Sequence, residues 1–283
     1  PVAHSFPTRR SSDLLLRARE QTGGTSSVSR LATRLKRSFA GMPQWETCRW
    51  HAIYVSASLQ KQYEEAGFSP GKAAVIHNGY DADTAPRDWP AGPPDVYTLG
   101  YVGRVRPNKG LAELLGALER CLAGGRQDLR LRIVGRGDPA YEAELRARIR
   151  STPLAERVEW IGALPREKVL QAYRAFDLLV VPSQWEEPFG LVAIEAMGAG
   201  VPVLATRRGG LKEIIDDSCG WLCECDSASI ADGLEEALGD YPRLREKGLA
   251  APQRVAQAFA WQDKIDRVED VLDEAVQQTK DRG

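Results

Sequence analysis

The sequence predicts an α/β protein whose C-terminal part forms a complete, doubly wound parallel sheet. From Tyr97 onward, strand-like and helix-like segments alternate along the chain, and the strand-like segments are mostly apolar. Strands of that kind are typical of a parallel sheet that helices cover on both faces. The contents of 43% hydrophobic and 27% charged residues are ordinary for a globular protein. No apolar run approaches the roughly 20 residues that a membrane-spanning helix needs.

The strands of this sheet follow from short β-type runs. In chain order we expect them at residues 97–102, 129–134, 158–161, 178–181, 201–205 and 220–223. The helices follow from apolar residues at helical spacing, such as the leucines between residues 108 and 122. We expect them at residues 108–122, 141–149, 167–176, 191–197, 211–215, 228–238, 242–258 and 261–278.

A different piece of chain precedes residue 96. Strands are expected at residues 51–56 and 73–76, with a helix at 58–66 between them. His77-Asn78-Gly79 is a turn signal, and residues 81–95, which hold four prolines, are typical of an interdomain linker. Further upstream, four apolar residues share one helical face: Val28, Leu31, Leu35 and Phe39. We therefore expect part of one α/β domain and its linker in residues 15–95, and a complete second domain in residues 96–260.

The first fourteen residues do not resemble natural protein sequence. Residues 4–14 read HSFPTRRSSDL and resemble the translation of a sequencing adapter. The alternative is a basic targeting peptide, but no apolar stretch follows Arg9-Arg10 as a signal peptide requires. We therefore expect residues 1–14 to be an artefact, the natural sequence to enter near Leu15, and an N-terminal portion of the protein to be missing.

Charge and cysteine content exclude two classes of protein. The chain has 38 Lys and Arg against 39 Asp and Glu, a formal net charge of −1, which argues against a chain-wide basic surface for nucleic acid. Five cysteines, an odd number, indicate reduced thiols in a cytoplasmic protein rather than a disulfide framework. Cys219, Cys223 and Cys225 lack an obvious fourth metal ligand, so we interpret them as structural, with Asp226 as a helix cap.

The strongest chemical pattern is Glu187-Pro188-Phe189-Gly190-Leu191-Val192-Ala193-Ile194-Glu195. It directly follows an expected strand, and Gly190 opens a helix whose free amides and positive dipole suit a phosphate. A glycine there lets a ligand approach the backbone. Glu187 and Glu195 would accept hydrogen bonds from hydroxyls of a sugar ring or a ribose, at the sheet edge where open α/β sheets bind ligands. The alternative is a pair of acids that the helix dipole favours.

A second pattern, Gly103-Arg104-Val105-Arg106-Pro107-Asn108-Lys109-Gly110, lies between the first strand and the first helix of the same domain. Arg104 and Lys109 at this junction would neutralise a diphosphate, and Asn108 is expected to be a helix N-cap. Alone the pattern is weak, because basic loop residues are usually just solvated. Paired with the first pattern it becomes specific.

Residues 97–276 resemble the donor-binding half of a family-4 (group 1) glycosyltransferase with the GT-B fold. The residues that carry this resemblance are Gly103-Arg104, Lys109-Gly110, Val134-Gly135-Arg136-Gly137, Trp160-Ile161-Gly162, Pro182-Ser183, Glu187 to Gly190, Leu191, Glu195-Ala196, Gly209-Gly210 and Glu213. Upstream, Ser56 and Ile76, Asn78-Gly79 and Asp81 resemble the end of the acceptor domain. The resemblance implies a Rossmann-like donor domain in residues 96–260, a partial acceptor domain in 15–95, and a helix in 261–283 that crosses back to the first domain.

The resemblance also implies an activity and a site. A sugar would move from a nucleotide-diphosphate sugar (UDP-, GDP- or ADP-sugar) to an acceptor hydroxyl with retention of configuration, and no metal or cofactor would be required. Arg104 and Lys109 would bind the diphosphate, with help from the amides around Gly190 and Leu191. Glu187 would bind the transferred sugar and Glu195 the ribose, and the segment Trp160–Leu164 would lie against the base. The full implied set of catalytic and donor-binding residues is Arg104, Lys109, Glu187, Gly103, Trp160, Gly162, Leu164, Phe189, Gly190, Leu191 and Glu195.

Two departures and two alternatives accompany this prediction. Lys212 stands where the family often carries proline, and the glycine-rich acceptor-domain loop with its histidine is absent from the sequence, so the chain is alternatively an inactive nucleotide-sugar-binding fragment. The run from Gly135 to Ala140 also fits the dinucleotide pattern G-x-G-x-x-A of an NAD-dependent oxidoreductase. It would follow the second strand of the domain rather than the first, and no acid is clearly placed at the end of the next strand.

The segment between Leu15 and Trp50 has seven basic and two acidic residues. A cationic helix with an apolar stripe can lie on an anionic membrane, which predicts peripheral contact at the inner membrane face. The alternative is a helix that packs its stripe into the acceptor domain. The expected partners are therefore a nucleotide-sugar donor and a carbohydrate or lipid-linked acceptor, and not nucleic acid.

Overall fold

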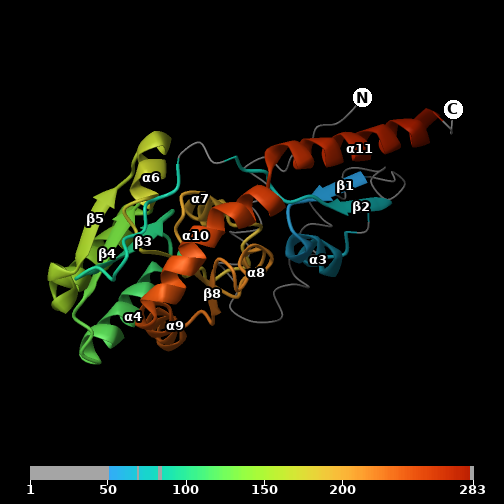
Figure 1. Cartoon of the computed structure of the whole chain (residues 1–283). Helices are drawn as coiled ribbons and strands as arrows, with labels where there is room; N and C mark the ends of the chain where they lie inside the picture. Colours follow the sequence, from blue (N-terminus) through green and yellow to red (C-terminus); the bar gives the residue numbers. More distant parts are fainter. Residues whose placement is uncertain (1–50, 69, 82–84, 281–283) are drawn as a thin grey trace. The chain divides into compact units, whose positions relative to one another are not determined.

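The computed structural model describes residues 51–68, 70–81 and 85–280 (Figure 1). These residues fall into two compact units: an N-terminal unit, which contains residues 51–54 and 60–74, and a C-terminal unit, which contains residues 55–59 and 75–280. The adapter-like residues 4–14, the predicted apolar helix face and the basic segment 15–50 lie outside the described residues. Among the helices that are described, none is both long enough and apolar enough to cross a membrane.

The N-terminal unit contains a two-stranded sheet of β1 (His51–Tyr54) and β2 (Lys72–Val75). Between them runs α3 (Ala57–Glu65), whose first residues belong to the C-terminal unit. The rings of Tyr54 and Tyr63 lie 5.6 Å apart, and those of Tyr63 and Phe68 lie 5.5 Å apart. The three predicted elements of this region are present, with ends that differ from the prediction by one or two residues.

The C-terminal unit is built on six parallel strands in the order β5-β4-β3-β6-β7-β8. They are β3 (Tyr97–Val102), β4 (Leu129–Val134), β5 (Val158–Gly162), β6 (Leu178–Val181), β7 (Val203–Thr206) and β8 (Gly220–Cys223). The first strand, β3, pairs with β4 on one side and with β6 on the other, so the strand order reverses between β3 and β6. In a doubly wound sheet the crevice for a ligand opens at that reversal, outside the carboxyl ends of the strands.

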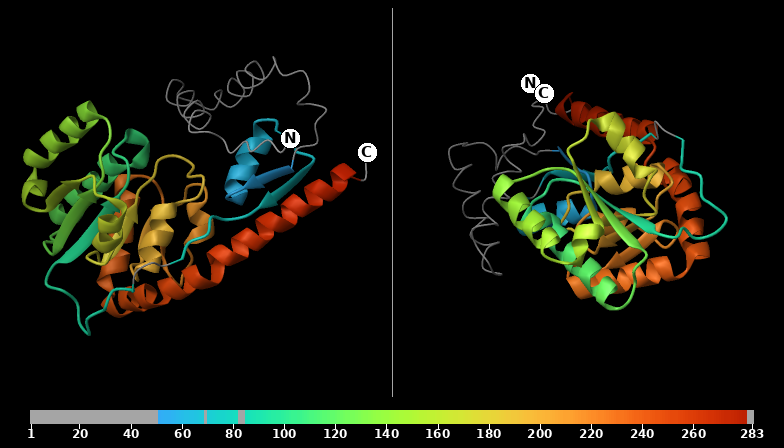
Figure 2. Two further views of the ribbon diagram at one scale, coloured as in Figure 1. Left: turned by 90° about the horizontal axis from the view of Figure 1, so that it is seen from above. Right: turned by 90° about the vertical axis from the view of Figure 1, so that its left-hand side faces the viewer.

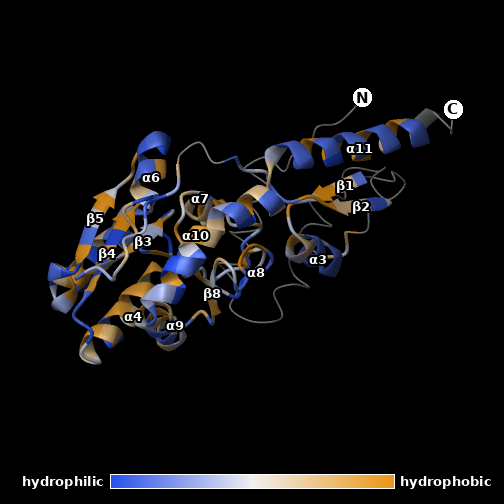
Figure 3. Cartoon of the chain, viewed as in Figure 1, coloured by the Kyte–Doolittle hydropathy of each residue, from blue (hydrophilic) through white to orange (hydrophobic). Residues whose placement is uncertain are grey.

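Helices cover both faces of this sheet (Figure 2). They are α4 (Leu111–Ala123), α5 (Pro139–Arg150), α6 (Arg166–Tyr173), α7 (Leu191–Gly198), α8 (Leu211–Ile214), α9 (Ser227–Gly239) and α10 (Tyr241–Ala258), followed by α11 (Trp261–Lys280) and joined by short 3-10 turns at Pro107–Lys109 and Pro153–Glu156. The hydropathy colouring shows apolar residues concentrated in the strands and in helices such as α4 (Figure 3). The predicted doubly wound, Rossmann-like architecture is confirmed for the C-terminal unit.

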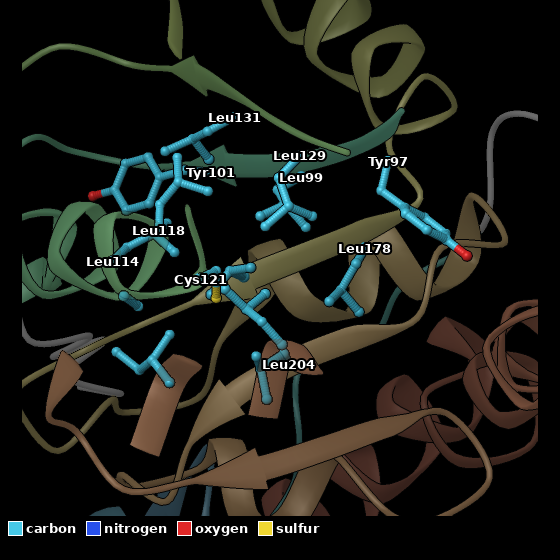
Figure 4. Close-up of a cluster of buried hydrophobic side chains, with 14 of the residues drawn as sticks. Tyr97, Leu99, Tyr101, Leu114, Leu118, Cys121, Leu129, Leu131, Leu178 and Leu204 are labelled. Carbon is cyan, nitrogen blue, oxygen red and sulfur yellow. The ribbon is translucent and has the colours of Figure 1, made fainter. Parts of the chain in front are cut away.

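Two clusters of buried side chains form the core, one on each face of the sheet. The α4-face cluster joins α4, α5 and α9 to residues such as Leu99, Leu131 and Leu204 (Figure 4). The α7-face cluster joins α6, α7 and α8 to residues such as Leu179 and Val203. The inner strands β6 and β7 are buried throughout, which requires strands rich in apolar residues, the pattern that predicted them. The edge strand β5 is only partly covered.

The first helix of the unit begins later than predicted, and Asn108 is not its N-cap. A 3-10 turn occupies Pro107–Lys109, and α4 starts at Leu111 after Gly110, which has a φ of +73° and provides no side-chain cap. A Cβ atom at Gly110 would lie 1.7 Å from the carbonyl oxygen of Pro182. The close approach of the loop after β6 thus fixes a left-handed turn here, which separates the two helical segments.

Asp226 is a helix cap, as predicted. Its side chain accepts hydrogen bonds from the amides of Ala228 and Ser229, each at 2.9 Å, at the start of α9. The predicted strand 201–205 begins two residues late, because β7 starts only after Pro202, whose nitrogen has no hydrogen to donate to a neighbouring strand.

Candidate functional site

Two loops meet at the point where the strand order reverses. The β3 loop, residues 103–110, follows β3, and the β6 loop, residues 182–190, follows β6. The amide of Gln184 donates to the carbonyl oxygen of Asn108 at 3.0 Å, and Gly110 packs against the backbone of Pro182. The structure therefore brings together the two patterns that the sequence had separated by about 80 residues.

The centre of this contact is an ion pair between Lys109 and Glu187. Lys109 Nζ lies 2.5 Å from Glu187 Oε1, and the hydroxyl of Ser183 donates to the same oxygen at 2.5 Å. The side chain of Glu187 is only 11% exposed, and Ser183 is buried. No described residue forms a hydrogen bond with the second carboxylate oxygen, Oε2, so that atom is the acceptor left for a ligand hydroxyl.

Lys109 is held on a second side by an aromatic ring. Its Nζ lies 4.8 Å from the ring centroid of Trp185, within the range of a cation–π contact. A lysine that is fixed by both a carboxylate and a ring loses little further side-chain entropy when an anion binds. It is therefore a preorganised positive charge.

Arg104 is one of two exposed arginines in the β3 loop, the other being Arg106. Within the described part of the chain, no carboxylate forms an ion pair with the Arg104 guanidinium. Its backbone is fixed, because the hydroxyl of the buried Tyr101 donates to the carbonyl oxygen of Arg104 at 2.8 Å. Burial, with the nearby Tyr141 and Glu187, raises the pKa of Tyr101 well above its ordinary value, so the phenol remains a hydrogen-bond donor.

The β6 loop ends at the N-terminus of α7. Gly190 has a φ of +127°, and no side chain caps the helix. A Cβ atom at Gly190 would lie 2.7 Å from a side-chain carbon of Leu211 in α8, so packing inside the protein also requires a glycine here. Phe189 is buried, and Leu191 is 50% exposed. The first amides of α7 thus lie beside an exposed apolar side chain, an arrangement that can bind an anion.

Glu195 lies in a different environment from Glu187. It receives a hydrogen bond of 2.9 Å from the hydroxyl of Tyr173 and an ion pair of 3.1 Å from Arg166, both on α6. Its side chain is 12% exposed, whereas that of Arg166 is 66% exposed. Burial and the neighbouring carboxylate raise the pKa of Tyr173 well above its ordinary value, so this phenol also remains a donor.

The residues expected near the base do not share one surface. Trp160, in β5, packs against the α4-face cluster, and the guanidinium of Arg146 lies 4.1 Å from its ring centroid. Leu164 packs against the α7-face cluster. Gly162, with a φ of +86°, has open space where a Cβ atom would be.

Close backbone packing explains the two glycines of the Gly135-Arg136-Gly137 run after β4. A Cβ atom at Gly135 would lie 1.8 Å from the carbonyl oxygen of Gly103, and one at Gly137 would lie 1.7 Å from that of Val105. The two glycines therefore let this turn pack directly on the β3 loop. Asp138 then caps α5 through the amides of Ala140 and Tyr141.

The cysteines and histidines contribute other contacts. The part of the chain that the structure describes holds no group of three His, Cys, Asp or Glu side chains arranged for a metal ion. Burial raises the pKa of Cys219 to about 11 and that of Cys223 to about 12. His77 Nε2 lies 3.0 Å from an oxygen of Glu213, a contact that no sequence pattern indicated.

Sequence reasoning missed four residues around the two carboxylates: Ser183, Trp185, Tyr173 and Arg166. Trp185, Tyr173 and Arg166 act through tertiary contacts that no local spacing records, whereas Ser183 contacts Glu187 within the same loop, four residues away. Ser183 belongs to a quoted part of the family pattern, which was the one signal that pointed to it.

Comparison with known proteins gives consistent results. The family model described as "Glycosyl transferases group 1" matches residues 88–254. The chain is 34% identical over 183 residues to the D-inositol 3-phosphate glycosyltransferase of Corynebacterium diphtheriae, an alignment that covers 62% of this chain and 42% of that protein. It is 34% identical over 217 residues to the glycogen synthase of Mycobacterium tuberculosis, which covers 74% and 50%. The chain thus spans half or less of the length of these relatives.

A solved structure with a similar fold is that of HepE from Anabaena in complex with UDP. The sequence identity is 25%, the TM-score is 0.69, and the match covers 78% of this chain and 63% of HepE. The bound UDP belongs to the HepE structure.

Proposed function

The chain belongs to the group 1 glycosyl transferases, and from that membership we propose that it transfers a sugar from a nucleotide-diphosphate sugar to an acceptor hydroxyl, with retention of configuration at the anomeric carbon. The observation that carries this proposal is the Lys109–Glu187 pair at the strand-order reversal. It joins a diphosphate-binding cation to a carboxylate with one free oxygen.

Each part of the pair has a role in the proposed reaction. Lys109 and Arg104 neutralise the negative charge that develops on the diphosphate as it leaves, assisted by the first amides of α7. Glu187 accepts hydrogen bonds from hydroxyls of the transferred sugar through its free Oε2. Because Lys109 and Ser183 both hold Oε1, the carboxylate is positioned before the substrate arrives.

The bond changes of the proposed transfer balance without a protein base. The bond from the anomeric carbon to the diphosphate oxygen breaks, and a bond from the acceptor oxygen to the same face of that carbon forms. The acceptor proton passes to the leaving diphosphate. The chain's own residues then supply charge stabilisation and position, and the reaction as proposed requires neither metal nor cofactor.

The nucleotide end of the donor is assigned to α6, α7 and β5. We propose that Glu195 binds the ribose, with Tyr173 as its support, and that Gly162 and Leu164 lie beside the base. Trp160 packs against the α4-face cluster. We therefore propose that the backbone that follows Trp160, rather than its ring, contacts the base. HepE binds UDP, which supports a nucleotide sugar as the donor.

The proposed acceptor is a carbohydrate or a lipid-linked saccharide. We propose that the acceptor binds to an acceptor domain in residues 15–95. We also propose that the protein is cytoplasmic and that its basic segment 15–50 contacts a membrane surface. We propose that the C-terminal segment, residues 261–283, crosses back to this acceptor domain. The alternative function is that of a binding module, in which the chain binds the donor without transferring or hydrolysing the sugar.

The test is to incubate the purified chain with UDP-, GDP- and ADP-sugars and to follow release of the nucleoside diphosphate. Release, by transfer or by hydrolysis, supports the enzyme. Binding of a nucleoside diphosphate without release supports the binding module. Binding of NAD with no affinity for any of the three diphosphates would contradict the proposal.

A further inference from the structure

The turn after β4 extends the sheet beside the β3 loop. Val105 and Gly137 form a parallel bridge, and the amide of Val105 donates to the carbonyl oxygen of Arg136 at 3.1 Å. One step nearer the sheet, the amide of Gly103 donates to Val134 at 3.0 Å. Arg104 and Arg136 are therefore neighbours across this short two-stranded extension.

The register also determines the side on which these residues lie. Side chains alternate along extended backbone, and Val105 is fully buried in the α4-face cluster. The residue before it, Arg104, therefore points away from that cluster. In the paired turn, the residues on either side of Arg136 are glycines, so Arg136 is the residue that projects a side chain beside Arg104. Both arginines are exposed.

Two acids that follow Arg136 in the chain, and the carboxylate of the β6 loop, already have partners. Asp138 caps α5, Glu142 accepts the amide of Gly137, and Glu187 holds Lys109. Among the described residues, no carboxylate forms an ion pair with Arg104 or Arg136. Two like charges directly opposite each other across paired strands are destabilising, so a bound anion between them would relieve that repulsion.

We propose that Arg136 is a further donor-binding residue, which shares the diphosphate of the nucleotide sugar with Arg104; this inference rests on the proposed function. The charge balance supports it. A sugar diphosphate carries a negative charge on each of its two phosphate groups. Arg104 and Lys109 both bind it in the proposed site, but Glu187 offsets the charge of Lys109, so these three groups leave the diphosphate short of one positive charge. Arg136 supplies that charge. The deficit grows as the leaving group gains charge in the transition state.

The experiment compares Arg136→Ala with Arg150→Ala, an exposed arginine at the other end of α5. Calorimetry measures the Kd of each variant for the preferred nucleoside diphosphate among UDP, GDP and ADP, for its monophosphate and for its nucleoside. Arg136→Ala raises the Kd for the diphosphate about tenfold or more, that for the monophosphate less, and that for the nucleoside hardly at all. Arg136→Lys recovers part of the loss, because lysine lacks the bidentate fork. Arg150→Ala behaves as the unchanged chain.

A stability measurement separates binding from a structural role. Because Arg136 faces a like charge, Arg136→Ala leaves the thermal midpoint of the unliganded chain unchanged or raises it, while the increase in midpoint on adding the diphosphate shrinks. A lower unliganded midpoint with equal losses for all three ligands would overturn the inference. An unchanged Kd of Arg136→Ala for the diphosphate would also overturn the inference. If Arg104→Ala and Lys109→Ala nevertheless weakened diphosphate binding, the proposed function would stand. Failure of the unchanged chain to bind any of the three diphosphates would overturn both.

Discussion

Glu187 and Glu195 belong to one sequence pattern but work in different surroundings. Glu187 lies in the β6 loop and is held by a lysine from the β3 loop and by a buried serine. Glu195 lies within α7 and is held by a buried tyrosine and an exposed arginine, both on α6. In the proposed function, the paired Lys109 places Glu187 next to the diphosphate, where charge develops, whereas a phenol and an exposed arginine hold Glu195 for the ribose hydroxyls. The comparison teaches that the residues in contact with each carboxylate, more than the sequence motif that both share, determine its proposed role.

The largest effect is expected from Lys109→Ala. The change removes a charged hydrogen bond and leaves Glu187 without its cation, so we expect a loss of about 1.5–3 kcal/mol of affinity for the nucleoside diphosphate, and a small loss for the nucleoside. Calorimetric titration with both ligands measures this. Lys212→Ala, which removes an exposed lysine of the same unit, is the control. Equal losses for diphosphate and nucleoside would refute the role of Lys109.

Glu195→Ala is expected to act on the other half of the ligand. The loss of ribose contacts should weaken binding of the nucleoside diphosphate by about 1–3 kcal/mol, and binding of the nucleoside by a similar amount. The ratio of the two losses therefore distinguishes this variant from Lys109→Ala in the same titration. Unchanged nucleoside affinity would count against the ribose assignment.

Tyr173→Phe sharpens the comparison without removing a carboxylate. It deletes the 2.9 Å hydrogen bond to Glu195 and keeps the buried ring, so we expect a loss of about 1 kcal/mol in nucleotide affinity. Measured in the background of Glu195→Ala, the same change should have no further effect on binding, because Tyr173 acts through that carboxylate. An undiminished second loss would show that the tyrosine has another role.

A third carboxylate, Glu213, provides the contrast in stability. Burial alone would raise its pKa, but hydrogen bonds from the Ser58 amide, His77 and the Ala57 amide hold the pKa below the ordinary 4.5. A depressed pKa in the folded state stabilises the protein above that ordinary value, and the contribution disappears as the pH falls through the folded pKa.

Glu213→Gln should therefore lower the free energy of unfolding by about 1 kcal/mol near neutral pH. The difference from the unchanged chain should shrink as the pH falls below about 4.5. Urea titrations at a series of pH values test both parts. A difference that stays constant with pH would mean that the carboxylate charge is not the cause.

The sequence predicted the sheet well, because a strand buried on both faces is identified by its own apolar residues. It predicted less about where helices begin. The turn at Gly110 depends on the backbone of Pro182, a contact that no local pattern records. The candidate site divides in the same way. Lys109 and Glu187 were identified from two separate sequence patterns, and the structure places them 2.5 Å apart. The support of Glu195 by Tyr173 arises only when α6 packs against α7.

The most direct test of the central claim is a crystal structure of the chain with its preferred nucleoside diphosphate. The account predicts that phosphate oxygens lie within hydrogen-bonding distance of Arg104 and Lys109, beside the first amides of α7, with the ribose hydroxyls at Glu195. A diphosphate bound away from the β3 and β6 loops, with the Lys109–Glu187 pair facing solvent alone, would contradict it.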